Sequence, residues 1–73
     1  MNNNFIKIRK GLYRGLLYND FYVEIKHNEI EHRWTAFIHK DRNFLKLLIA
    51  LTLKDCISFV YDYIEQLKKK KGR

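Results

Sequence analysis

The sequence predicts an α+β domain in which a three- or four-stranded antiparallel sheet carries one C-terminal amphipathic helix on one of its faces. Two patterns lead to this fold class. Before residue 51, apolar and polar residues alternate in several short runs, as they do in half-buried strands. After residue 52, apolar residues recur at every third or fourth position, which is typical of one face of a helix.

The predicted strands are short and are separated by polar turns. Strands are expected at 5–9, 21–26 and 31–39, and residues 16–18 are expected to open a further strand. Turns are expected at 19–20, 27–29 and 40–43, where polar residues gather. Gly11 and Gly15 bracket a bend, or two turns with a little extended chain between them. Such short connections allow hairpins and need no crossover before the helix.

Residues 44–51 fit either a buried last strand or a short helix, because periodicity does not separate the two in so short a run. A strand is favoured, since the run ends directly at a strong helix start. There, Thr52 can accept a hydrogen bond from the first helical turn, and Asp55 can reach back in a variant of the capping box. The helix should cover residues 52–69.

One side of this helix is apolar and should pack on the sheet. Its stripe contains Leu53, Ile57, Val60, Tyr61, Ile64 and Leu67, widened by Cys56, Phe59 and Tyr63. The sheet face beneath it should hold Phe21, Val23, Ile25, Trp34, Ala36 and Ile38. The opposite face would then show Tyr22, Lys26, Arg33, Phe37 and His39.

The chain of 73 residues has room for one domain and one core. Residues 1–4 should be a frayed start, 5–51 a mainly β region, and 70–73 a basic tail after the helix. A hydrophobic share of 47% and an aromatic share of 15% indicate a globular protein rather than a disordered one. The formal net charge of +7 favours an anionic partner, although such a charge also serves solubility.

Residues suited to catalysis or metal binding are few. The candidate metal ligands are His27, His32, His39 and Cys56, but the sequence has no CxxC or HxxxH pair. Cys56 lies in the first helical turn, beside the apolar stripe, which favours a buried structural thiol over a reactive one. The glycines fit no phosphate-binding spacing. We therefore expect no enzyme activity, no metal and no cofactor.

The predicted binding residues combine aromatic rings with positive charge. They are Tyr22, Lys26, Arg33, Phe37, Lys68, Lys69, Lys70 and Lys71. Interleaved aromatic and basic side chains stack bases and neutralise phosphates, so the first interpretation is a non-catalytic module that contacts nucleic acid or a nucleoprotein. Alternatively, Tyr22 and Phe37 form a cross-strand pair that only stabilises the sheet. The terminal lysines would then only complement the helix dipole.

Exposed aromatic residues also suit a protein interface. An open sheet edge can pair with a partner strand or with an identical chain. The second interpretation is therefore a protein-binding inhibitor or adaptor, acting on a host protein, either as a monomer or as a homodimer.

The expected location is the cytoplasm, without a membrane partner. No signal peptide is visible, and the longest apolar stretch, 47–51, is too short to span a bilayer. A single cysteine fits a reducing compartment.

Three segments carry a resemblance in layout: Tyr22-Val23-Glu24-Ile25, Arg33-Trp34-Thr35-Ala36-Phe37-Ile38, and Thr52-Leu53-Lys54-Asp55 with the later pairs Phe59-Val60 and Tyr63-Ile64. Over residues 20–67 the chain resembles short accessory proteins of phages and other mobile elements, including anti-CRISPR and other anti-defence inhibitors built from a β-sheet and one helix. The resemblance implies binding to a larger machine in the host cytoplasm rather than chemistry. It carries over no functional residue.

Overall fold

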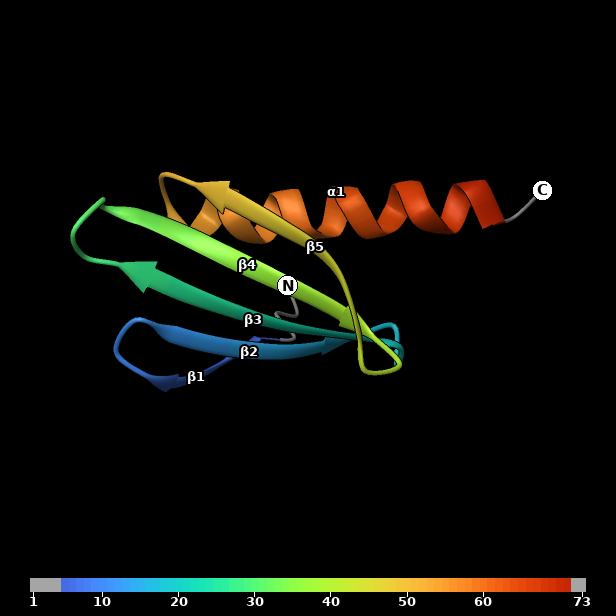
Figure 1. Cartoon of the computed structure of the whole chain (residues 1–73), viewed down its shortest axis with the longest axis horizontal. Helices are drawn as coiled ribbons and strands as arrows, with labels where there is room; N and C mark the ends of the chain where they lie inside the picture. Colours follow the sequence, from blue (N-terminus) through green and yellow to red (C-terminus); the bar gives the residue numbers. More distant parts are fainter. Residues whose placement is uncertain (1–4, 72–73) are drawn as a thin grey trace.

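The computed structural model describes the backbone of residues 5–71 and the side chains of residues 5–69, so the predicted frayed start at 1–4 and the end of the basic tail lie outside it. Five antiparallel strands form one sheet in the order β1-β2-β3-β4-β5, and each strand pairs with the next along the sequence. One helix, α1, follows them (Figure 1). The elements are β1 (Phe5–Arg9), β2 (Leu12–Leu17), β3 (Phe21–Asn28), β4 (Arg33–Lys40), β5 (Asn43–Ala50) and α1 (Leu53–Lys71).

The predicted α+β class is confirmed, but the predicted number of strands is too low. The bend expected between Gly11 and Gly15 is instead most of β2, which runs straight through Gly15. Gly15 is buried and lies opposite Phe5 on one side and Val23 on the other. Because β2 pairs with a strand on each side, its backbone groups gain partners that outweigh the local turn preference of glycine.

The turn expected at 27–29 also lies later in the chain. β3 continues to Asn28, and the side-chain oxygen of Asn28 accepts hydrogen bonds of 3.0 Å from the N–H groups of Ile30 and Glu31. This Asx-type turn replaces the glycine that a tight hairpin would otherwise need. The strand β4 consequently begins at Arg33, two residues after its predicted start.

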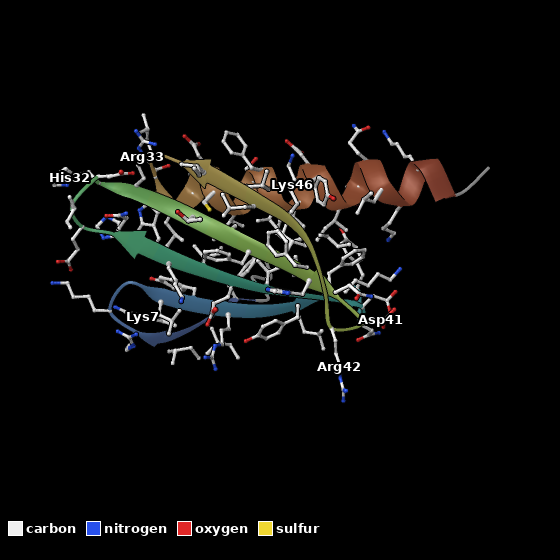
Figure 2. The ribbon with its side chains drawn as sticks, viewed as in Figure 1. Lys7, His32, Arg33, Asp41, Arg42 and Lys46 are labelled. Carbon is white, nitrogen blue, oxygen red and sulfur yellow. The ribbon has the colours of Figure 1, made fainter. Side chains whose placement is uncertain are left out.

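The ambiguous run after residue 43 is a strand, as the sequence favoured. β5 pairs with β4 and begins after a two-residue turn made by Asp41 and Arg42. Both turn residues have positive φ, 52° and 68°, which is the backbone of a type I′ hairpin turn. Figure 2 shows Asp41 and Arg42 at one end of the sheet and His32 and Arg33 at the other.

The helix start confirms the predicted role of Thr52 in the cap. The hydroxyl oxygen of Thr52 accepts a hydrogen bond of 3.1 Å from the N–H of Asp55. The helix then continues to Lys71, two residues past its predicted end, and its last turns project beyond the sheet (Figure 1). In the part of the chain that the structure describes, no helix combines the length and apolar character needed to cross a membrane.

The core lies between α1 and one face of the sheet, as predicted. Its buried members are Phe5, Leu17, Phe21, Val23, Ile25, Ala36, Ile38, Ala50, Cys56, Val60 and Ile64. Trp34 is half-buried against this cluster, so the helix does cover the face that holds Trp34. One predicted stripe residue, Phe59, is 44% exposed. Phe59 sits next to Val60, and Val60 rather than Phe59 points into the core.

Candidate functional site: the open face of the sheet

The helix covers one face of the sheet and leaves the other face open. Strand register aligns the residues of this open face in three rows that run across the strands. The aromatic row contains Leu16, Tyr22, His39 and Phe44. The ion-pair row contains Ile6, Arg14, Glu24, Phe37 and Leu47. The lysine row contains Leu12, Lys26, Thr35 and Ile49. We call these residues, with Arg9, Asn28 and Arg33 at one end, the open face.

Large apolar side chains dominate the open face. Those most exposed to solvent are Ile6 (68%), Leu16 (56%), Tyr22 (41%), Phe44 (54%), Leu47 (42%) and Ile49 (48%). They come from β1, β2, β3 and β5, and Phe37 and His39 of β4 lie between them in the same rows, so they form a continuous surface rather than scattered exposures. Continuous apolar surfaces on small proteins mark sites where another molecule binds.

The aromatic row is a chain of ring contacts. Tyr22 and His39 lie directly opposite each other on β3 and β4, with ring centroids 6.1 Å apart. His39 in turn meets Phe44 edge-on at 5.5 Å. The cross-strand pair considered for Tyr22 and Phe37 is not formed, because Phe37 lies opposite Glu24. The row therefore offers a strip of three adjoining rings.

Two of the four cations on the open face have a carboxylate neighbour. The Arg14 Nε donates to Glu24 Oε2 at 3.1 Å, near the centre of the ion-pair row. At the end of β4, Arg33 lies 3.8 Å from the Glu31 carboxylate. The Lys26 ammonium sits 5.7 Å from the centroid of the Phe37 ring. Two of the cations on this face thus already have an anionic neighbour, and a third rests on an aromatic ring.

The structure divides the predicted binding residues into two groups. Tyr22, Lys26, Arg33 and Phe37 share the open face, as expected from strand alternation. The terminal lysines belong to α1, which packs on the opposite face. Lys68 places its ammonium 3.8 Å from the centroid of the Tyr18 ring, and Lys69 is exposed. The side chains of Lys70 and Lys71 lie outside the described residues.

Sequence reasoning missed the aliphatic part of this face. The almost wholly apolar run that contains Phe44, Leu47 and Ile49 favours a buried strand. In the structure, β5 is an outer strand, and Ala50 is its one buried residue. Ile6 and Leu16 belong to β1 and β2. They share the open face because β2 is one continuous strand paired with β1.

The two outer edges of the sheet are less suited to binding than its open face. β1 carries Lys7 and Arg9, and its register with β2 shifts between those two residues. β5 carries Lys46, and its register with β4 shifts between Ile38 and His39. Charged residues and irregular register are the devices that prevent edge strands from pairing with other chains.

A small groove opens at the end of the sheet that holds the β1–β2 and β3–β4 turns. Its volume is about 570 Å³, and it is lined by Lys10, Gly11, His27, Glu29, His32 and Trp34. The His27 and Trp34 rings lie 4.7 Å apart, so one wall is aromatic. Among the described residues, no group of three or more His, Cys, Asp or Glu is placed to hold a metal ion.

Cys56 is fully buried and free, in agreement with the structural role favoured by the sequence. Burial in the apolar core raises the pKa of its thiol to about 11. A thiol with such a pKa carries almost no thiolate at neutral pH and is a weak nucleophile.

Comparison with known proteins finds no relative of this chain. No protein-family model, no curated protein and no solved structure matches it. The open face itself is therefore the ground on which a function can be assigned.

Proposed function

We propose that this chain is a small non-catalytic binding module that uses its open face to bind another polypeptide. The observation that carries the proposal is the continuous apolar surface formed by Ile6, Leu16, Tyr22, Phe44, Leu47 and Ile49. Sheets of this kind gain stability when a second layer covers their apolar side chains. An inhibitor or adaptor, as the resemblance to mobile-element proteins implies, would act through such a surface.

The composition of the open face favours a polypeptide over nucleic acid as its partner. Nucleic-acid surfaces need cations that are free to meet phosphates, whereas Arg14 and Arg33 each have a carboxylate neighbour. Bases stack on aromatic rings, which serves Tyr22 and Phe44 but leaves aliphatic residues such as Leu47 without a role. A protein surface uses both kinds of side chain.

A comparison of two matched variants tests the proposal. Leu47→Glu places a carboxylate in the open face, and Ile30→Glu makes the same change in the β3–β4 turn, at a residue that is 90% exposed. Tagged forms of the wild type and both variants are used to capture proteins from cells that express the untagged chain. We expect the wild type and Ile30→Glu to retain a polypeptide that Leu47→Glu loses. Identical captures for all three would refute the proposal.

Nucleic-acid contact is a second candidate, favoured by the net charge of +7. Lys7, Arg9 and Lys10 are exposed and form no ion pair within the described residues, so they remain available to phosphates. A test is titration with single- and double-stranded oligonucleotides. A binder with six phosphate contacts loses roughly a thousandfold in affinity between about 50 and 200 mM salt.

Variants determine which of two surfaces binds the oligonucleotide. Arg33→Ala and Phe37→Ala probe the open face, whereas Lys7→Ala and Lys10→Ala probe β1 and the turn that follows it. We expect weaker oligonucleotide binding only for the pair that lies on the contact surface. An absence of binding by the wild type at low salt removes nucleic acid from consideration.

A further inference from the structure

We propose that a second copy of this chain covers the open face, so that two sheets pack against each other with one helix on each outer side. This proposal rests on the proposed function, because it names the polypeptide that binds there. The assembly would have four layers in the order helix, sheet, sheet, helix. Face-to-face sheets pack about 10 Å apart and interdigitate their apolar side chains.

The size of the open face is suited to a stable dimer. Five strands spaced about 4.8 Å apart, with about 3.3 Å per residue along strands of up to eight residues, give a flat footprint of roughly 600 Å². Side chains that stand up from the sheet increase the accessible area further. A standard specific interface buries about 800 Å² on each partner, so one whole face is needed and is available.

The charge of the open face also fits a second copy. A chain of net charge +7 repels its own copy wherever its cations are unpaired. On the open face, however, Arg14 is paired with Glu24 and Arg33 with Glu31. The remaining cations of the face are Lys26 and, at its corner, Arg9, so most of the excess charge lies elsewhere.

The distribution of these cations suggests how the two copies are oriented. Lys26 and Arg9 lie in or beside the lysine row, and the aromatic row contains no lysine or arginine. A two-fold axis along the ion-pair row sets the aromatic row of each copy over the lysine row of the other. This arrangement brings Lys26 of each copy to the aromatic row of the other and places the two Arg14–Glu24 pairs next to each other.

The other apolar positions on the surface do not offer a comparable site. They are scattered: Tyr18, Ile30 and Leu51 lie in three different turns, Ile8 and Leu45 lie on the two edge strands, and Phe59 lies on the helix. The edges of the sheet carry cations and register shifts, which oppose strand-to-strand association. The open face is therefore the surface on which a symmetric contact can be built.

The test measures the mass of the full chain by sedimentation and light scattering over rising concentration. We expect the wild type to reach twice the 9.0 kDa mass of one chain. Added salt should maintain or tighten this association, because it screens repulsion between two basic chains. A mass of one chain at every concentration and salt level would overturn the proposal.

Matched variants locate the contact. Leu47→Glu should raise the dimer dissociation constant by roughly a hundredfold or more, because the interface would bury two unpaired carboxylates. Ile30→Glu should leave the constant unchanged. If Leu47→Glu shows an altered circular dichroism spectrum, Ile49→Glu on the same strand replaces it. Equal effects of the turn variant and the open-face variant would contradict the proposal.

Failure of this inference is distinguishable from failure of the proposed function. If the wild type is monomeric, and it captures a foreign polypeptide that Leu47→Glu does not capture, then the second copy is ruled out as the partner. The open face remains the binding surface in that case. If the wild type is monomeric and captures the same proteins as Leu47→Glu, both the dimer and the proposed polypeptide-binding function are ruled out.

Discussion

The Tyr18 hydroxyl donates a hydrogen bond of 2.8 Å to the Glu65 carboxylate, which joins the β2–β3 turn to the helix across 47 positions of sequence. Tyr18 has a φ of 56°, which is unusual for an aromatic residue, and Asn19 beside it has a φ of 60°. The Lys68 ammonium covers the same ring at 3.8 Å. The turn thus presents one side chain to two residues of α1.

The Tyr18 contact should make stability depend on pH in the alkaline range. The hydrogen bond to Glu65, with smaller contributions from burial and nearby negative charge, raises the pKa of Tyr18 above its ordinary value of 10.0. A group whose pKa is raised on folding contributes stability that is complete below the unfolded pKa and is lost as pH rises through the folded pKa.

We therefore expect Tyr18→Phe to be less stable than the wild type at neutral pH and to approach it above about pH 10. Urea denaturation at a series of pH values measures the difference. Tyr22→Phe is the control, because Tyr22 is a similarly exposed tyrosine on the opposite face. A difference between wild type and Tyr18→Phe that grows with alkaline pH would contradict the assignment.

The β4–β5 turn should become more stable when Arg42 is replaced by glycine. Arg42 has a φ of 68°, a left-handed conformation that costs a side-chain-bearing residue about 1 kcal/mol. Glycine adopts this conformation without strain, and its greater freedom in the unfolded chain offsets only part of the gain. We expect Arg42→Gly to raise the free energy of unfolding by about 0.5 kcal/mol.

Denaturant titration provides the measurement for this turn. Arg42→Ala serves as the control, because it removes the guanidinium but retains a Cβ atom and hence the backbone strain. If Arg42→Ala is stabilised as much as Arg42→Gly, the effect comes from charge rather than from conformation.

The helix offers a direct comparison between two apolar residues that the sequence treated alike. Ile64 is fully buried, whereas Phe59 is 44% exposed. We expect Ile64→Ala to lower the free energy of unfolding by about 2–5 kcal/mol. Phe59→Ala should change it by only about 0.5 kcal/mol. Thermal and chemical unfolding of both variants check this, and equal losses would place Phe59 in the core.

Local pattern was sufficient to predict the helix and the face of the sheet that it covers. Thr52 marks the helix start by a hydrogen bond within one turn, and alternation alone places Val23 and Ile38 on one face. These features depend on near neighbours in sequence, so a single sequence contains them.

Features that depend on distant pairing could not be predicted in the same way. The continuity of β2 depends on Gly15 lying between Phe5 and Val23, which are on other strands. The exposure of Leu47 depends on β5 being an outer strand. For this reason the aromatic and basic part of the open face was predicted, but its aliphatic part was not.

The buried thiol of Cys56 should be protected as long as the domain is folded. Burial raises its pKa to about 11, so the reactive thiolate is scarce at neutral pH, and the core also excludes reagent. We expect labelling by a thiol-reactive disulfide reagent to be slow in the native protein and to accelerate with added urea as molecules unfold.

The same pKa shift fixes the direction of a pH effect. Because the folded pKa of Cys56 lies above the ordinary 9.0, its contribution to stability is complete below pH 9 and is lost as pH rises toward about 11. Cys56→Ala lacks this group, so its stability relative to the wild type should improve over that interval. Rapid labelling of the native wild type at neutral pH would show that Cys56 reaches solvent without unfolding.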